Sequence, residues 1–271
     1  KAISISVLLV FSLIGLASYF AINDKGDEGE KAQVVEVVAD SIHYEIPVIE
    51  DGQRCEQIIV HEGYTVSYNG EWLIPNWVAY ELTRQETEGE EERNDKFSPD
   101  PMVEGEAVLH EDYKNSGYDR GHMAPAGDMK WSERAMDESF YTTNICPQNS
   151  NNNRGDWKDL EELAREWAVK YGSIYICCGP IVENVDLTIG IDRKIVVPQG
   201  FFKVFLRRDG EEWHSIGFVM ENKSQSRPLM TYAMSVDEVE EKTGIDFFYK
   251  LPSNIEYVVE KELDFSLWTV D

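Results

Sequence analysis

The chain of 271 residues is long enough for one large domain or two small ones, and its 42% hydrophobic content is normal for a folded core. Its formal net charge of −26 argues against a polyanionic partner, because an acidic surface and a phosphate backbone repel each other. The four cysteines, Cys55, Cys146, Cys177 and Cys178, lack C-x-x-C spacing, which argues against a structural zinc site.

Residues 2–22 contain no charged side chain and follow Lys1. A helix needs about 20 apolar residues to cross a bilayer, so this segment is predicted to be an export signal or a membrane anchor. Cleaved signal peptides have a shorter apolar core of about 7–15 residues, and the length therefore favours an uncleaved anchor with Lys1 on the cytoplasmic side. If the segment is cleaved instead, the protein is secreted or periplasmic.

The next segment, residues 23–44, is acidic and contains glycine, and it is expected to be a flexible linker that holds the domain off the membrane. The folded domain is therefore predicted to span residues 45–271. We expect a single domain in that part of the chain.

Strand patterns open this domain. Short runs rich in β-branched and aromatic residues lie at 57–60, 64–68 and 77–82. Asn69-Gly70, a dipeptide that favours tight hairpin turns, separates the last two runs. These runs are predicted to be successive antiparallel strands, and the charged run at residues 85–96 to be a loop.

The most distinctive stretch runs from Tyr118 to Trp167. Its first part, Asp119-Arg120-Gly121-His122, places a cation, a flexible residue and an imidazole at the end of a predicted strand. Its second part, residues 151–157, is predicted to be a polar loop that leads into an amphipathic helix at 157–171. The apolar face of that helix is expected to consist of Trp157, Leu160, Ala164, Trp167, Ala168 and Tyr171.

The rest of the chain is predicted to be scaffold. Apolar runs at 173–180, 194–207 and 213–222 indicate core strands. The capping box Ser235-Val236-Asp237-Glu238 predicts the start of a short helix, which Gly244 would end.

Cys177 and Cys178 are neighbours in one predicted strand, where adjacent side chains point to opposite faces. They are interpreted as two buried thiols with separate surroundings. A disulfide between Cys55 and another cysteine remains open for an oxidising compartment.

Three motifs of the distinctive stretch, DRGH, TNICPQN and N-R-G-D-W-x-x-L-E, resemble those of the DNA/RNA non-specific endonucleases of the ββα-metal fold, in the same order and at similar spacing. The resemblance extends over residues 45 to 271. It implies a mixed α/β (α+β) domain with central antiparallel sheets and a ββα-metal active site. It also implies a hydrolase that cleaves phosphodiester bonds of DNA and RNA with little sequence preference.

Phosphodiester hydrolysis needs a base, a divalent cation and donors that stabilise the transition state. His122 is the candidate general base, because imidazole has an unperturbed pKa near neutrality and the DRGH resemblance assigns it that role. The other histidines, His43, His61, His110 and His214, are interpreted as structural. The resemblance makes Asn153 the ligand of Mg²⁺, for which Mn²⁺ could substitute, and an amide oxygen suits such a hard cation. The alternative is that the asparagines of 149–153 are loop or helix-capping residues.

Five other residues are candidates for the site, and the resemblance implies the roles of Arg93, Glu161 and Asn144. Arg93, in the pair Arg93-Asn94, would reach the scissile phosphate, and Arg120 would bind a phosphate oxygen. Arg154 is a further candidate substrate contact. Glu161 would orient water bound to the metal, although it is also placed to pair with Arg165. Asn144 is expected near the site, either touching substrate or supporting His122.

The acidic runs at residues 24–30 and 86–92 lie outside the motifs, so a local cationic cleft is compatible with the net charge. DNA and RNA are the expected partners, a homodimer is possible, the membrane is a partner if the N-terminal helix stays, and no organic cofactor is expected. Two other functions stay open. One is an inactive nucleic-acid or protein-binding module of the same fold, and the other is a narrower nucleotide phosphodiesterase.

Overall fold

The computed structural model describes residues 42–49, 52, 54–192 and 194–270, and before them only the backbone of three strands. The chain divides into two units, Lys1–His43 and Tyr44–Asp271. In the first unit β2 pairs antiparallel with both of its neighbours. These strands are β1 (Val7–Phe11), β2 (Ala17–Ala21) and β3 (Glu36–Val37).

The predicted membrane segment at residues 2–22 and the predicted linker at 23–44 fall mostly outside the described residues. The parts of residues 2–22 that are described are strands, not the predicted helix. Across the described residues, none of the helices combines the length and the apolar character needed to cross a bilayer. Export and anchoring therefore stay predictions.

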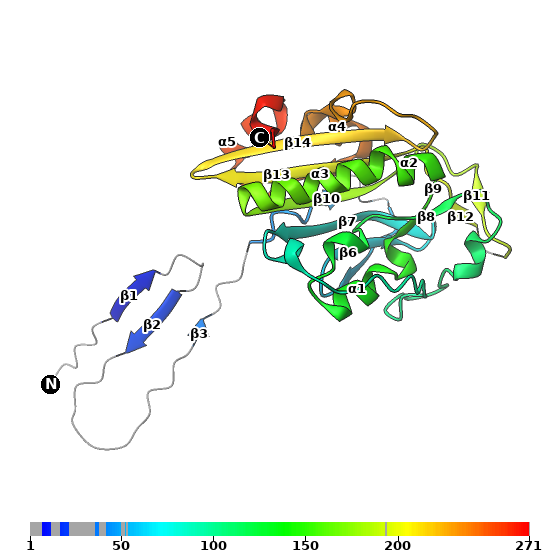
Figure 1. Cartoon of the computed structure of the whole chain (residues 1–271), viewed down its shortest axis with the longest axis horizontal. Helices are drawn as coiled ribbons and strands as arrows, with labels where there is room; N and C mark the ends of the chain where they lie inside the picture. The colour runs from blue at the N-terminus through cyan, green and yellow to red at the C-terminus, as the bar shows by residue number, and fades with distance from the viewer. Residues whose placement is uncertain are drawn as a thin grey trace, which may run out of the picture. The chain divides into compact units, whose positions relative to one another are not determined.

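The second unit is built on a sheet whose described part has seven antiparallel strands, in the order β15-β14-β13-β10-β7-β6-β5. Figure 1 shows β14, β13, β10, β7 and β6 stacked in that order. The strands are β5 (Gln57–Val60), β6 (Thr65–Asn69), β7 (Ile74–Thr83), β10 (Ser173–Ile181), β13 (Gly200–Asp209), β14 (Glu212–Glu221) and β15 (Ala233–Met234). Three smaller ladders pair β8 (Asp119–His122) with β9 (Ile145–Gln148), β11 (Thr188–Ile189) with β12 (Ile195–Val196), and β4 (Val48–Ile49) with β16 (Ile245–Asp246).

Helix α3 (Asp156–Tyr171) covers one face of the sheet and lies in front of β10 and β13 in Figure 1. Its predicted apolar face is confirmed, because five of the six expected residues are buried and Tyr171 packs against the same cluster. Each large apolar side chain that leaves water contributes about 1.5–3 kcal/mol, so this face fixes the helix on the sheet. Gly172, with φ of 95°, ends the helix in a conformation that favours glycine.

Two helices, α4 (Val236–Thr243) and α5 (Ser253–Lys261), pack on the opposite face of the sheet. The capping box of Ser235 and Glu238 and the left-handed cap at Gly244 are both present, as predicted. Alternation along the strands separates the two cores, since Cys178 belongs to the α3 side and Cys177 to the α4 side. The prediction of two buried thiols in separate surroundings is confirmed, and all four cysteines are free.

The remaining helices are short. Helix α1 (Glu133–Ser139) begins at the Ser132 cap, whose side chain accepts a hydrogen bond from the backbone N–H of Ala135. Helix α2 lies in the active-site region and is described below. The short 3-10 helices are η1 (Glu86–Glu88), η2 (His110–Tyr113), η3 (Ala126–Asp128), η4 (Thr142–Asn144), η5 (Leu229–Thr231) and η6 (Phe265–Trp268).

The fold class is confirmed, but two sequence predictions about strands were wrong in detail. The turn after β6 is not a two-residue Asn69-Gly70 hairpin. The Asn69 side chain accepts from the N–H groups of Glu71 and Trp72, and Leu73 takes φ of 59°, which makes a four-residue connection. The run at 194–207 is not one strand, because it is divided at Pro198, which has no N–H for a ladder.

Candidate active site

The DRGH segment forms β8, and its partner β9 comes from the TNICPQN motif. The register pairs Asp119 with Gln148 and His122 with Ile145. Gly121 is required here, because a Cβ at that position would lie 2.0 Å from Oε1 of Gln148. The two strands and the helices that follow them make a β-β-α unit beside the large sheet.

The asparagine run is a helix, not the predicted polar loop. Helix α2 (Ser150–Arg154) begins at Asn149, whose side chain accepts from the N–H groups of Asn151 and Asn152. Gly155 separates α2 from α3, and a Cβ there would lie 2.6 Å from the carbonyl oxygen of Asn151. Asn149 thus has the capping role that was one alternative for this run, whereas Asn153 lies in the last turn of α2.

Asp119 holds three side chains of α2 in place. Its carboxylate accepts from Nε and Nη2 of Arg154 at 2.8 and 2.9 Å, from Nδ2 of Asn153 at 3.1 Å and from Oγ of Ser150 at 3.0 Å. Burial acts to raise the pKa of Asp119, but these hydrogen bonds, from Arg154 foremost, keep it below the ordinary value. Because the amide nitrogen of Asn153 donates to Asp119, its oxygen is left for another partner.

His122 lies at the end of β8, between two aromatic rings. Its ring centroid is 5.4 Å from that of Phe97 and 5.0 Å from that of Phe140. The residue is 7% exposed, and within the described part of the chain its buried Nε2 has no hydrogen-bond partner. Burial, followed by the positive charges of Arg93 and Arg120, lowers the pKa of His122 to about 3. The imidazole is therefore neutral at physiological pH, which is the form that can accept a proton.

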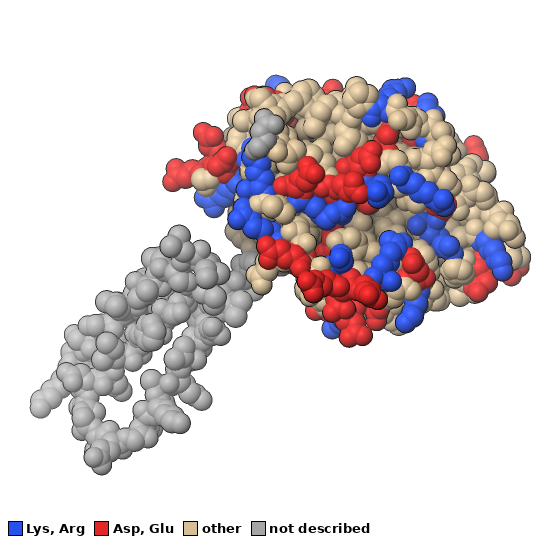
Figure 2. Space-filling view, in the orientation of Figure 1, with Lys and Arg blue, Asp and Glu red and all other residues tan. Residues whose placement is uncertain are grey.

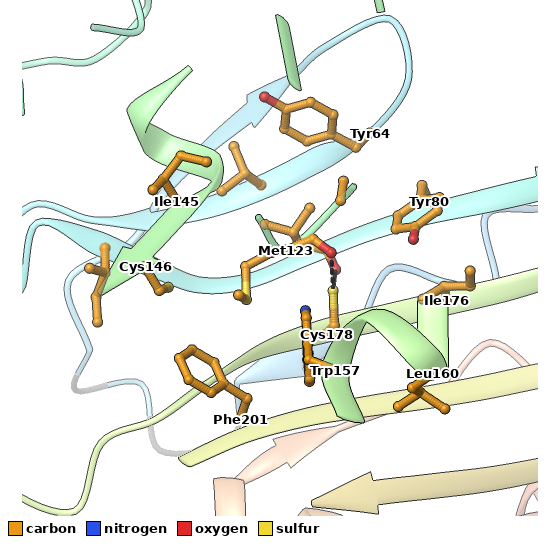
Figure 3. Close-up of a cluster of buried hydrophobic side chains, with 14 of the residues drawn as sticks. Tyr64, Tyr80, Met123, Ile145, Cys146, Trp157, Leu160, Ile176, Cys178 and Phe201 are labelled. Atoms are coloured by element: carbon orange, nitrogen blue, oxygen red, sulfur yellow. Dashed lines mark hydrogen bonds between the residues drawn. The ribbon is translucent and has the colours of Figure 1, made fainter. Parts of the chain in front are cut away.

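The backbone that carries His122 is fixed from the core. Nε1 of Trp157 donates to the carbonyl of His122 at 3.3 Å. The carbonyl of Met123 accepts from Sγ of Cys178 at 3.2 Å and from Nζ of Lys203 at 3.3 Å. Figure 3 shows Met123 and Cys178 joined in this way beside Trp157. Donors from α3, β10 and β13 thus converge on two consecutive carbonyl groups.

Asn144 lies behind this segment and not in the cleft. It is 0% exposed, and its Nδ2 donates to the carbonyls of Ala124 and Ser139, both at 2.8 Å. Its Oδ1 accepts from the N–H of Ala124 at 2.9 Å. Of the two alternatives for Asn144, these contacts favour support of the segment after His122 over contact with substrate.

Glu161 is partly buried on α3 and faces the same cavity as His122. Burial raises its pKa to about 7, and Asp128 adds to the rise although the cations of Lys203, Arg165 and Arg93 oppose it. The ion pair with Arg165, which was the alternative role for Glu161, is not formed among the described residues. Arg165 instead contacts Asp128 at 2.7 Å.

Arg120 and Arg93 flank His122 on its open side. Nη1 of Arg120 lies 2.8 Å from Nδ1 of His110, and its guanidinium stacks 4.6 Å from the Phe97 ring centre. Nε of Arg93 contacts Asp95 at 2.6 Å. His110, interpreted from sequence as structural, therefore lies in direct contact with a predicted site residue.

Two adjoining cavities make up the cleft. The inner cavity has a volume of about 300 Å³ and contains His122 and Glu161. The outer cavity, of about 570 Å³, adds Tyr118, Lys114 and His110. The lining residues common to both cavities are Arg93, Arg120, Asn153 and Arg154. Of the predicted site residues, the cleft thus unites all except Asn144.

Five cations line the inner cavity, in keeping with the expected local cationic cleft, and Figure 2 shows basic side chains gathered between acidic bands on this face. Most of them are already paired with carboxylates. The pairs are Arg93 with Asp95, Arg154 with Asp119, Lys158 with Glu162, and Arg165 with Asp128. Among these described cations Arg120 is the exception, since its guanidinium contacts the imidazole of His110. The positive charge of the cleft is therefore largely balanced.

Sequence reasoning did not assign several residues of this region. Lys203 and Cys178 lie in runs that were predicted to be core strands. The sequence of such a strand does not show which carbonyl group a buried side chain will donate to. His110 is 10 positions from Arg120, with no motif around it.

The chain belongs to the DNA/RNA non-specific endonuclease family, whose model matches residues 48–254. Mouse (Mus musculus) mitochondrial nuclease EXOG is 34% identical over 209 residues, covering 70% of this chain and 56% of that protein. Nuclease C1 of Cunninghamella echinulata var. echinulata is 31% identical to this chain. The aligned region covers 74% of this chain and 86% of nuclease C1. A solved structure of the EndoG/EndoGI complex matches with a TM-score of 0.68 at 28% identity, over 74% of this chain and 89% of that chain. The chain thus spans less than two thirds of the mitochondrial EXOG relatives it matches.

Proposed function

We propose that the protein is a magnesium-dependent endonuclease that hydrolyses phosphodiester bonds of DNA and RNA with little sequence preference. The observation that carries this proposal is the pairing of two groups in one cleft: a neutral, unpartnered imidazole and an oriented amide. His122 supplies the proton acceptor, and Asn153 supplies an oxygen ligand. Both lie next to arginines that can bind a phosphate.

The donor groups of the cleft fit a hard divalent cation. Asn153 offers its oxygen because its nitrogen donates to Asp119, and Glu161 adds a carboxylate facing the same cavity. Within the described residues the cleft has no group of three His, Cys, Asp or Glu ligands close enough for one ion. Mg²⁺ tolerates such a poor protein set, because it keeps several waters and uses substrate phosphate oxygens as ligands. Mn²⁺ is a possible substitute.

In this proposal the imidazole of His122 takes the proton from the attacking water, and its burial keeps the ring neutral until then. Glu161 orients water near Asn153 when it is ionised. Arg93 and Arg120 donate to the oxygens of the scissile phosphate, where negative charge develops. The cation, when bound, would lower the energy of that charge as a Lewis acid.

Approach of a phosphate also changes the base. Arg93 and Arg120 both lower the pKa of His122, and a phosphate dianion or diester bound to them offsets their charge. The pKa of His122 then rises towards its ordinary range, which makes it a stronger base once substrate is present. Recognition of one scissile phosphate reads no base edges, so little sequence preference is expected.

The deciding experiment is a plasmid-nicking assay with the purified protein and Mg²⁺, repeated with single-stranded RNA and with a dinucleotide. Endonucleolytic nicking that EDTA abolishes is the expected result. Activity that survives EDTA contradicts the metal assignment. Hydrolysis of the dinucleotide alone would identify the narrower phosphodiesterase, and no turnover with retained binding would identify the inactive module.

A further inference from the structure

A second group of carboxylates lies on the other face of the sheet, where α4 and α5 meet. Asp237 and Glu240 come from α4, and Glu260 comes from α5. One carboxylate oxygen of each residue lies within 4.8 Å of the corresponding oxygens of the other two. Oxygens bound to one Ca²⁺ at 2.3–2.6 Å can be at most about 5.2 Å apart, so the spacing suits a shared cation.

Glu260 separates this group from an ordinary acidic surface patch. The residue is 5% exposed, and its buried Oε1 has no hydrogen-bond partner among the residues that the structure describes. A buried carboxylate without a partner is costly in free energy, and native proteins rarely retain one unless a proton, a water or an ion completes it. The other two residues are partly exposed, which leaves an approach from solvent.

The charged groups with the strongest influence on Glu260 are carboxylates. They are those of Glu240, Glu256, Asp246 and Asp237. Glu260 therefore faces the same sign of charge from both helices and from β16. Within the chain's net charge of −26, this is a place where added positive charge would relieve repulsion.

We propose that Asp237, Glu240 and Glu260 bind a calcium ion that ties α4 to α5. Glu240 also accepts from the N–H of Phe247 through Oε1, at 2.8 Å, so its carboxylate is held in position by the segment after α4. Oγ of Ser215 donates to the carbonyl of Val259 at 2.7 Å, which fixes the last turn of α5 on β14. The ligands are thus presented by backbone that is anchored on both sides.

Calcium fits this set better than magnesium does. Ca²⁺ takes six to eight oxygen ligands and accepts bidentate carboxylates in flexible geometry, whereas Mg²⁺ demands a near-ideal octahedron with several waters. Three carboxylates supply up to six oxygens, and the site has no nitrogen or sulfur donor. The site lies on the sheet face opposite to α3, so its role is to stabilise the helical layer and not to take part in hydrolysis.

The test is a calcium titration by isothermal calorimetry on the full chain carrying Asn153→Ala, which removes the ligand of the proposed catalytic cation. We expect one bound Ca²⁺ with a Kd below about 1 mM, and Mg²⁺ binding at least about tenfold weaker. At calcium near 100 times the Kd, the melting temperature should rise by about 5–10 °C.

Glu260→Gln and Asp237→Asn should each weaken calcium binding by at least about tenfold and remove the thermal shift. The matched control is Glu241→Gln, which removes one exposed carboxylate from the same helix and should leave binding unchanged. The proposal is overturned if no saturable site is found, if Mg²⁺ binds more tightly, or if Glu241→Gln weakens binding as much as Glu260→Gln. Asp237 is partly exposed, so its variant keeps the test valid if Glu260→Gln fails to fold.

Discussion

Two shielded glutamates, one on each side of the large sheet, show how neighbours decide what a carboxylate can do. Burial raises the pKa of both, to about 7 for Glu161 and about 9 for Glu260. Around Glu161 the cations of Lys203, Arg165 and Arg93 oppose that rise, whereas the strongest charges around Glu260 are all negative. Glu161 is therefore poised to change charge near neutrality, and Glu260 needs a proton or a cation.

The same contrast separates the two faces as a whole. On the α3 side, the arginines and lysines of the cleft are mostly matched to carboxylates, and an imidazole is left without a partner. On the α4 side, carboxylates meet one another. We infer that chemistry belongs to the first face and stability to the second.

The largest effect expected is on the first face. His122→Ala should lower the rate of DNA cleavage by about 10²–10⁴, the usual contribution of a general base, and should leave folding intact. His214→Ala is the matched control, because that histidine lies outside the cleft. The cleavage rate of each variant tests the loss of activity, and its circular dichroism spectrum tests whether it is folded. A folded His122→Ala protein that cleaves at nearly the normal rate would contradict the mechanism.

Asn153→Ala should raise the magnesium concentration needed for half-maximal rate by more than about tenfold, and Glu161→Ala should raise it less. Loss of a residue that only supports a metal ligand weakens metal affinity by about 10–100-fold. Loss of the ligand itself should therefore weaken it by more than about tenfold. Rates over a magnesium series test this. Equal effects of the two substitutions would show that Asn153 is not the principal ligand.

The pH dependence of kcat/KM, which reflects the protein without bound substrate, should report Glu161 and not His122. Glu161 is ionised above about pH 7 and protonated below it, whereas His122 is already neutral down to about pH 3. At limiting magnesium, the rate should therefore rise with pH through about 7. Glu161→Gln should remove this rise of the rate with pH. Glu162→Gln should not remove it, because Glu162 is paired with Lys158 and is exposed. If the rise with pH persists in the Glu161→Gln variant, a group other than Glu161 causes it.

The smallest effect expected is that of salt. Each phosphate contact adds about −0.9 to the slope of log affinity against log salt, and most cleft cations are already paired with carboxylates. The slope from about 20 to 200 mM salt should therefore be shallower than about −3, and the rate can rise slightly as salt screens the acidic surface. A steeper, steady loss would reveal a cationic groove that extends beyond the two cavities.

Features with strong local causes could be read from the sequence. The 3.6-residue period of α3, the alternation that separates Cys177 from Cys178, and the capping box at Ser235 each depend on neighbours in sequence. Five of the seven predicted site residues lie in motif segments that form β8, α2 and α3, and Arg93 reaches the cleft from an earlier loop.

Features that depend on distant contacts could not be read. Asn144 is held in the interior by hydrogen bonds to carbonyl groups of two other segments. Arg165 pairs with the distant Asp128 and not with Glu161, which is four residues away on the same helix. Helices α1 and α5 were not predicted, since both are short and gain their stability from the layers they cover. The roles of the site residues stay proposals.

The carbonyl groups of His122 and Met123 couple the reaction centre to the interior. Because their donors sit on α3, β10 and β13, the position of the imidazole is set by how these three elements pack, and not by the β8 hairpin alone. Substitutions at Trp157 or Lys203 that loosen this packing would displace the base before they unfold the protein. Heat should then abolish the proposed cleavage activity below the melting temperature, and the gap between the two temperatures would measure how strongly that activity depends on core packing.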